Sequence, residues 1–319
     1  MCSGSEFPKG CIGCDNGNSV WGLANRSTSD YTCGSGLFFD VDNFGSPLAS
    51  QYPTQTLPDE SQNKAMFEGA ADLLSDVFGF GRRLGVGAAV GVEVPLGVTY
   101  PWANGTEKEH FEGIFTRMKR LKLPIEQFWL YSSEGSMNAG INSTSLSVQQ
   151  IVRDAHTAIA ALAKVWPESN VTIGMSGWML GPPDRPYYFD EVLPASVAIT
   201  TLDPNVGWDP VDPGWANVTA KGRSKMLIPW AEDDPGLAGP ELWVERMLDH
   251  ARVGAGYGCN GLLAVHWRTS ELVPEFAAMR AAAWDDAPTA RAVYTEFCTA
   301  QFGAEVRTRL WFRHAVDLH

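Results

Sequence analysis

Acidic side chains follow two apolar runs of the sequence, at the points where each run stops. Glu232, Asp233 and Asp234 come directly after the run Met226–Trp230, and a Pro-Gly turn follows them. Glu134 follows the segment "FWLYSS" and precedes a glycine. Adjacent carboxylates repel one another, so their grouping indicates either a solvated loop or a site that needs negative charge.

Two separated carboxyl groups are the side chains that glycoside hydrolysis requires. One carboxyl group protonates the leaving oxygen, and the other attacks the anomeric carbon or activates a water molecule. An apolar surround from Trp129 or Tyr131 would favour the protonated form of Glu134, which suits a general acid. We therefore predict Glu134 as the general acid/base and Glu232 as the nucleophile or base. Asp233 is the second candidate within the acidic group.

Polar and aromatic side chains also recur where the other predicted strands end. Aromatic rings stack on the C–H faces of sugars, and carboxylates, amides and guanidinium groups bind sugar hydroxyls or carboxylates. In the loop 208–215, Trp208 or Trp215 could form such a stacking surface. The predicted substrate-binding residues are Asp40, Asn43, Glu93, Tyr131, Trp178, Asp203, Trp208, Trp230, His266, Trp267 and Arg268.

The segments that must position these residues alternate between strand and helix patterns. Apolar residues at helical spacing predict helices over 60–83, 107–124, 145–167, 239–258 and 273–284. Apolar runs without polar alternation predict strands near residues 36, 84, 126, 171, 196, 226 and 261. His156 and His250 lie within the predicted helices, where we interpret them as structural or surface residues.

This alternation indicates parallel strands joined by crossover helices, and therefore the α/β class. We predict a (β/α)8 TIM barrel whose first strand is missing or unrecognised within residues 1–33. The alternative is an open doubly wound sheet. Such a sheet usually carries a glycine-rich nucleotide turn after its first strand, whereas "GFGRRLG" at 79–85 precedes a strand.

Residues 1–33 form an irregular extension rich in cysteine and glycine, and residues 34–319 form the predicted catalytic barrel. "CIGC" at 11–14 has no second pair at zinc-like spacing, so we predict no metal site and no cofactor. Sequons begin at Asn25, Asn104, Asn142, Asn170 and Asn217, and with six cysteines they favour a secretory route. No signal peptide stands in residues 1–20, which leaves a fragment or a wrongly assigned first exon as explanations.

Charge and hydropathy exclude several classes of partner. The 319 residues carry a formal net charge of -13, which disfavours binding to nucleic acid. No apolar segment is long enough to span a bilayer. Twelve tryptophans suit a large core with some rings left for a binding cleft. We expect a carbohydrate partner, and the sequence does not predict an oligomeric state.

The predicted arrangement resembles the large clan of (β/α)8 retaining glycosidases over about residues 34–290. That resemblance implies an acid/base Glu after the fourth strand and a nucleophile Glu after the seventh, which match Glu134 and Glu232. Ser133 stands where the clan usually has Asn, a residue that contacts the sugar 2-hydroxyl. The ending "GLLAVHWR" is similar in style to α-glucuronidase and hexosaminidase barrels.

Two other functions remain open from the sequence. A barrel that binds carbohydrate without cleaving it would explain Ser133 and the missing strand. A metal-dependent hydrolase could use His266 with the acidic group, although such sites usually need several histidines at strand ends.

Overall fold

A computed structural model of the chain describes most of the residues after position 59. The described residues are 60–96, 106–132, 146–203, 205, 208–219, 222–231, 242–265, 272–285 and 287–303. They fall into two compact units. The first holds the described residues up to 177 together with 181–197, and the second holds 178–180 and those from 198 onward.

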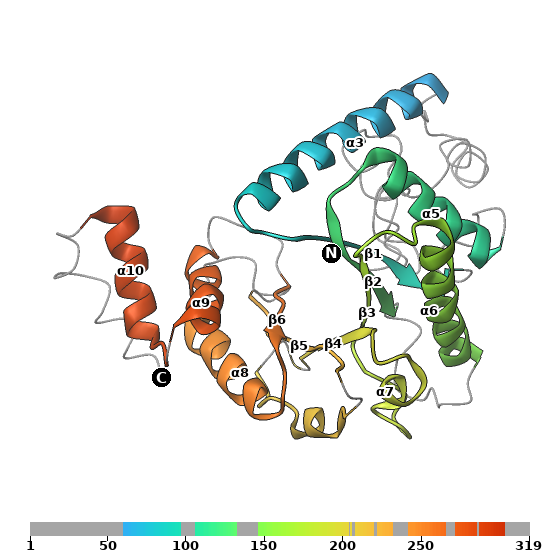
Figure 1. Cartoon of the computed structure of the whole chain (residues 1–319). Coiled ribbons are helices and arrows are strands. Elements are labelled where there is room, and N and C mark those ends of the chain that lie inside the picture. The colour runs from blue at the N-terminus through green and yellow to red at the C-terminus, as the bar shows by residue number, and fades with distance from the viewer. Residues whose placement is uncertain are drawn as a thin grey trace, which may run out of the picture. The chain divides into compact units, whose positions relative to one another are not determined.

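The first unit pairs three parallel strands and covers them with helices (Figure 1). Its elements are α3 (Glu60–Arg83), β1 (Ala88–Val94), α5 (Glu107–Leu121), β2 (Ile125–Ser132), α6 (Leu146–Val165), β3 (Thr172–Ser176) and α7 (Tyr188–Val192). Strand β2 lies between β1 and β3, and α5 packs side by side with α6.

Helix α5 shows why the sequence forms these elements. Thr106 and Glu109 make a reciprocal capping box, which satisfies two backbone N–H groups at the start of the helix. The buried face of α5 includes Phe111 and Phe115. The ring of Phe115 meets that of Phe128 on β2 edge-on, with 5.0 Å between ring centroids. Burying each such ring contributes about 2–3 kcal/mol, so this face fixes α5 on the sheet.

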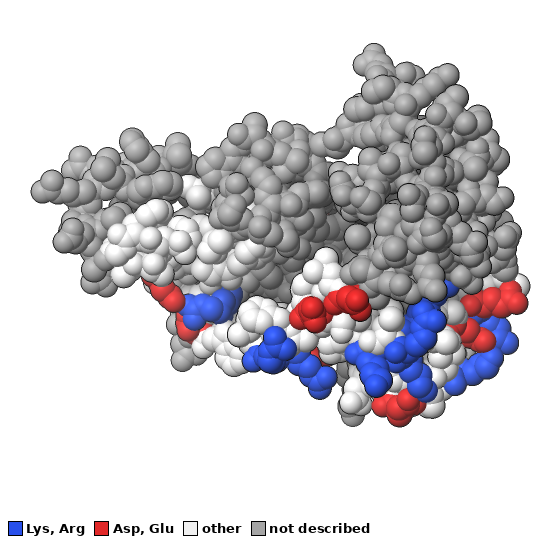
Figure 2. Space-filling view, turned by 90° about the horizontal axis from the view of Figure 1, so that it is seen from above, with Lys and Arg blue, Asp and Glu red and all other residues white. Residues whose placement is uncertain are grey.

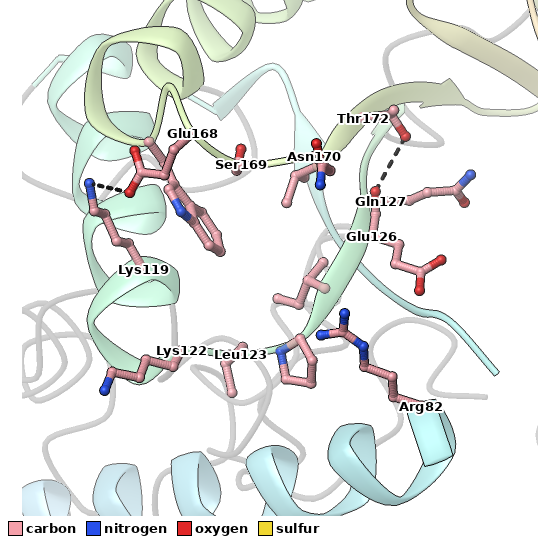
Figure 3. Close-up of a pocket in the computed structure, with 14 residues that line it drawn as sticks. Arg82, Lys119, Lys122, Leu123, Glu126, Gln127, Glu168, Ser169, Asn170 and Thr172 are labelled. Atoms are coloured by element: carbon pink, nitrogen blue, oxygen red, sulfur yellow. Dashed lines mark hydrogen bonds and ion pairs between the residues drawn. The ribbon is translucent and has the colours of Figure 1, made fainter. Parts of the chain in front are cut away.

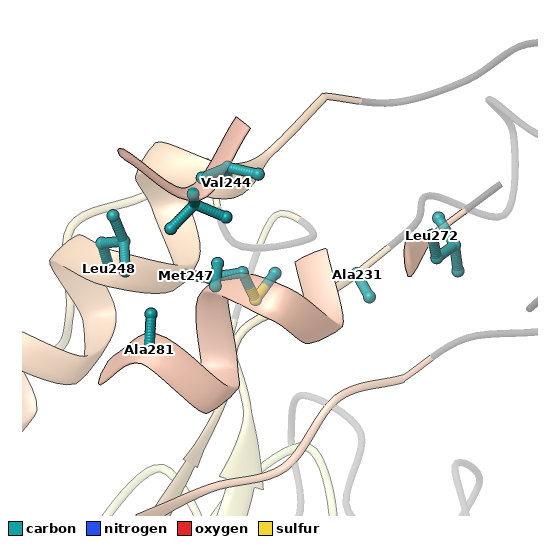
Figure 4. Packing of buried hydrophobic residues seen from close by; sticks show 8 residues of the cluster. Ala231, Val244, Met247, Leu248, Leu272 and Ala281 are labelled. Atoms are coloured by element: carbon teal, nitrogen blue, oxygen red, sulfur yellow. The ribbon is translucent and has the colours of Figure 1, made fainter. Parts of the chain in front are cut away.

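The second unit repeats the pattern with shorter strands. Its elements are β4 (Ala198–Leu202), η5 (Pro213–Asn217), β5 (Lys225–Ile228), α8 (Val244–Gly256), β6 (Gly261–Leu262), α9 (Val273–Trp284) and α10 (Ala290–Phe302). Strand β5 pairs in parallel with both β4 and β6. One buried cluster joins α8, α9, α10 and the segment that follows β5 (Figure 4). Its members are Ala231, Val244, Met247, Leu248, Leu272, Ala278, Ala281 and Val293.

The predicted closed (β/α)8 barrel is wrong. The described residues form six parallel strands, three in each unit, in the order of the sequence, and β1 and β6 stand at the open ends of that order. Alternation of strand and helix is common to open and closed parallel sheets, so the pattern alone could not establish closure. Six of the seven predicted strands are confirmed, and the one near residue 36 lies outside the described residues.

The charged side chains of the described part are mixed in sign. In the view of Figure 2, basic and acidic side chains lie beside one another on the described surface. Among the described helices, none combines the length and apolar character that crossing a bilayer requires.

Candidate functional site

Two predicted site residues lie in one row of register partners at the carboxyl ends of the strands in the first unit. Glu93 of β1 is in register with Tyr131 of β2, and Tyr131 is in register with Ser176 of β3. Residues in register on parallel strands share a face of the sheet. The side chain of Glu93 lies outside the described residues, whereas Tyr131 is half-buried. The sequence predicts Glu93 and Tyr131 as substrate-binding residues from their place at strand ends, and the pairing of the strands puts them in one register position.

One layer further into the sheet, Trp129 occupies the space left by glycines. Gly91 of β1 and Gly174 of β3 are its register partners. A side chain at Gly174 would overlap the indole ring of Trp129. The indole Nε1 donates a hydrogen bond to Gln127 Oε1 at 3.2 Å. Trp129 stands two residues before Tyr131 on β2, so its ring lies on the same face of the sheet. The ring covers the glycines that precede the row of Glu93, Tyr131 and Ser176.

The last residue of β2, Ser132, places a hydroxyl group at the carboxyl end of the strand. Ser132 is fully buried, and its Oγ has no hydrogen-bond partner among the described residues. It lies so close to Gly177 that a side chain there would overlap Oγ. Ser133 and Glu134 are the next residues of the chain and lie outside the described part. An unsatisfied buried hydroxyl is costly, so Ser132 Oγ is available to a partner at this strand end.

The turn that follows Val94 is held by a buried carboxylate. Asp154 of α6 accepts a hydrogen bond from the backbone N–H of Leu96, with 2.7 Å between N and Oδ2. Burial raises the pKa of Asp154 to about 6, against the lowering effect of the Leu96 hydrogen bond. Asp154 was not among the predicted site residues, and its spacing on α6 matches an ordinary core position.

Two predicted aromatic residues come together in the second unit. The ring centroids of Trp178 and Trp230 are 5.5 Å apart, with 37° between the ring planes. Trp230 is buried, and its Nε1 donates to the backbone oxygen of Asp203 at 3.0 Å. Trp230 also forms a parallel bridge with Val265, and the Ala231 N–H donates to the Val265 oxygen. The chain therefore continues from two paired residues into Glu232 and His266.

The carboxylate of Asp203 is engaged by a helix. Its Oδ2 lies 2.7 Å from Nε2 of His250 on α8, and both residues are buried. The two atoms do not meet hydrogen-bond geometry, so the contact is a close polar contact without an aligned hydrogen bond. His250 Nδ1 lies 2.9 Å from the carbonyl oxygen of Arg246, which can only accept, so Nδ1 carries a proton.

Because the Asp203 carboxylate contacts His250, it is the backbone oxygen of Asp203 that orients the Trp230 ring, by accepting a hydrogen bond from its Nε1. We had interpreted His250 as structural or surface, and it is a buried structural partner. No local sequence signal could have paired it with Asp203, because the two residues meet only when α8 packs on the strands.

Trp208 forms an exposed stack with the start of α8. The Arg246 guanidinium carbon lies 3.7 Å from the ring centroid of Trp243 and 4.4 Å from that of Trp208. Trp208 is 62% exposed, so much of its ring remains open to solvent. Trp215, the other predicted stacking residue of this loop, is 1% exposed and belongs to the core.

The remaining predicted site residues lie outside the described part of the chain. They are Asp40, Asn43, Glu134, Glu232, Asp233, His266, Trp267 and Arg268. Within the described residues, no group of three or more His, Cys, Asp or Glu side chains could hold a metal ion. Cys259 and Cys298 are free thiols, and burial raises the pKa of Cys259 to about 11.

A cavity of about 810 Å³ lies at the opposite, amino edge of the first unit (Figure 3). Ile125 and Thr172, the first residues of β2 and β3, line it. Lys119 and Glu168 form an ion pair on its wall, with 2.9 Å between Nζ and Oε1. Because none of the predicted site residues lines this cavity, we treat it separately from the carboxyl-edge residues.

Comparison with known proteins does not assign this arrangement to a family. No protein-family model matches the chain, and no curated protein matches its sequence.

Proposed function

We propose that the protein is a glycoside hydrolase that cleaves an oligo- or polysaccharide. In this proposal Glu134 is the general acid/base and Glu232 is the nucleophile or base, with Asp233 as its neighbour in the acidic group. Neither a metal nor a cofactor takes part. The carboxyl groups supply both the proton and the nucleophile, which is the full requirement of acetal hydrolysis.

The observation that supports the proposal is the chemistry gathered at the carboxyl ends of the parallel strands. In the first unit, β2 brings Tyr131 to this edge and ends two residues before Glu134. In the second unit, the paired rings of Trp178 and Trp230 lie at this edge, and Glu232 follows the buried Ala231. Ligand sites of parallel α/β sheets lie at this edge of the strands.

The direct test measures hydrolysis by charge-neutral variants. Purified wild type is screened on aryl glycosides and polysaccharides, and the best substrate is then used for Glu134→Gln and Glu232→Gln. General acid–base and nucleophilic groups contribute about 10²–10⁴-fold, so each variant should lose at least about 100-fold in kcat/KM. Glu296→Gln, which alters an exposed residue of α10, is the matched control and should keep wild-type activity.

The role of Glu232 can be separated from that of Glu134 by chemical rescue. In Glu232→Gly, added azide should occupy the vacated space, attack the anomeric carbon and release a glycosyl azide. The anomeric configuration of the wild-type product, followed by NMR, reports whether Glu232 acts as nucleophile or as base. Full activity in either Gln variant would contradict the assignment of that residue.

A carbohydrate-binding protein without catalytic activity is the second candidate. Its specific support is Ser133 in the place of the usual Asn, together with six described strands where a closed barrel has eight. In that case the same polysaccharide panel would show binding by calorimetry, and no variant or wild-type sample would release reducing sugar.

A further inference from the structure

Two sequons have their asparagine in the described part of the chain. Asn170 lies in the loop between α6 and β3, and Asn217 is the last residue of η5. Both asparagines are exposed. They differ in their surroundings, because Asn170 lines the amino-edge cavity and Asn217 does not. Figure 3 shows Asn170 on the same stretch of loop as Glu168 and Ser169.

A tight turn that begins at Trp166, whose side chain lines the same cavity, stands directly before Asn170. The Ser169 N–H donates to the Trp166 oxygen at 3.0 Å, which closes a four-residue turn directly before Asn170. Trp166 is half-buried and lines the same cavity. An aromatic ring in the cavity that the attachment point also lines offers a flat surface on which the C–H face of a sugar can stack.

Polar groups complete a surface suited to sugar hydroxyl and amide groups. Arg82, Lys122 and the amide of Gln127 line the cavity, and the first two make no ion pair among the described residues. Binding sites for small molecules commonly have volumes of about 300–1,000 Å³, and this cavity falls in that range. It is therefore large enough for the first sugars of a chain attached at its rim.

We propose that Asn170 is an N-glycosylation site and that the first sugars of its glycan pack into the amino-edge cavity against Trp166. In the modification, Asn170 Nδ2 forms a bond to the anomeric carbon of a lipid-linked oligosaccharide diphosphate. The bond from that carbon to the diphosphate oxygen breaks, and the amide proton leaves with the diphosphate. This inference goes beyond the proposed hydrolase activity and does not depend on it.

The first measurement is site occupancy. The chain is secreted from a eukaryotic cell behind a cleavable signal peptide, and the glycopeptides that contain Asn170 and Asn217 are quantified by mass spectrometry. We expect Asn170 to be occupied. An unoccupied Asn170 in secreted, folded protein overturns the proposal.

The second measurement tests packing in the cavity. For secreted protein, Asn170→Gln should lower the melting temperature by about 2–4 °C, whereas Asn217→Gln should not. Thr172→Val removes the sequon and keeps Asn170, so its secreted and bacterial forms should melt together, whereas secreted wild type should melt about 2–4 °C above bacterial wild type. Protein produced in bacteria lacks the glycan, so it separates the effect of losing the glycan from the effect of changing the side chain. In that material, wild type and Asn170→Gln should melt at the same temperature.

The remaining outcomes contradict the packing. An occupied Asn170 whose removal leaves the melting temperature unchanged would show a glycan that projects into solvent. An equal shift in secreted and bacterial Asn170→Gln would show that the side chain itself, and not its glycan, is responsible.

Discussion

Asp154 shows how a single buried carboxyl group links the stability of the first unit to pH. Its folded-state pKa is raised to about 6 from 3.8, chiefly by burial. Between these two values the folded chain binds more protons than the unfolded chain. The free energy of unfolding therefore falls as pH rises through this window, and the Asp154 contribution is constant above it.

We predict that Asp154→Asn removes this pH dependence. Asn keeps an oxygen that can accept the Leu96 N–H and has no charge to bury. Between pH 4 and 7 the wild type should lose about 2 kcal/mol of stability relative to this variant. Urea unfolding across that range measures the difference. Asp76→Asn, at an exposed position of α3, should follow the wild-type profile, and parallel profiles for all three proteins would contradict the prediction.

At the scale of residues, the sequence predicts Trp178 and Trp230 as substrate-binding residues near strand ends, and the structure brings their rings together. Their place near strand ends was predictable because each tryptophan stands two residues after a strand, and strand ends are visible as local patterns. The partners of Asp154 and Asp203 were not predictable. Each meets a group from a distant segment, and such pairs are created by packing, which leaves no local signal.

Among the elements, the second unit is tied together by one buried ammonium group. Lys225, the first residue of β5, donates from Nζ to the carbonyl oxygens of Trp215, Val218 and Tyr257 at 2.7–3.1 Å. These acceptors belong to η5, its C-cap and the C-cap of α8. Each N–H of the ammonium group has an acceptor. Lys225 therefore connects strand β5 to η5 and to the C-terminal end of α8 through hydrogen bonds.

We predict that Lys225→Met destabilises the protein by about 3 kcal/mol. Methionine fills a similar volume but leaves three carbonyl oxygens without this donor. Equilibrium unfolding in urea checks the loss. The matched control is Lys164→Met, because Lys164 is exposed and pairs with Glu112 at the surface, and such pairs contribute less than about 1 kcal/mol. Equal effects from both substitutions would contradict the role of Lys225.

Most element boundaries were predictable, and the exceptions have a physical cause. The helices predicted over 60–83 and 273–284 match α3 and α9. Helix α10 was not predicted. Only Val293 of its residues is buried, so it lacks a strong apolar stripe, although Thr289 caps its start by accepting the Ala292 N–H.

For the whole molecule, net charge should shape the choice of substrate. The formal charge of -13 repels anionic polymers over a distance that salt shortens. If the proposed hydrolase activity is correct, uronate-rich polysaccharides should bind more weakly at 20 mM than at 200 mM salt, whereas neutral polysaccharides should be unaffected. Affinity electrophoresis at several salt concentrations measures this. Tighter binding of the acidic polymer at low salt would instead indicate a local basic site.

The closed barrel could not be predicted reliably from the sequence. Each strand–helix repeat is encoded by local periodicity, but closure depends on the number of strands and their tilt, which no repeat encodes. The six parallel strands of the described residues follow the predicted chain order and share the predicted carboxyl edge within each unit. The parallel direction of the strands was therefore predictable from the sequence, although whether the sheet closes into a barrel was not.

The fit of Trp129 against Gly174 also constrains how the sequence can diverge. Because the indole occupies the place of a side chain at position 174, neither residue can be exchanged freely while the other stays the same. Relatives of this chain should therefore show paired exchanges, with a smaller residue at 129 wherever 174 gains a side chain. Either order of the two exchanges passes through a less stable intermediate, because a side chain gained first at 174 overlaps the indole and a smaller residue first at 129 leaves a cavity.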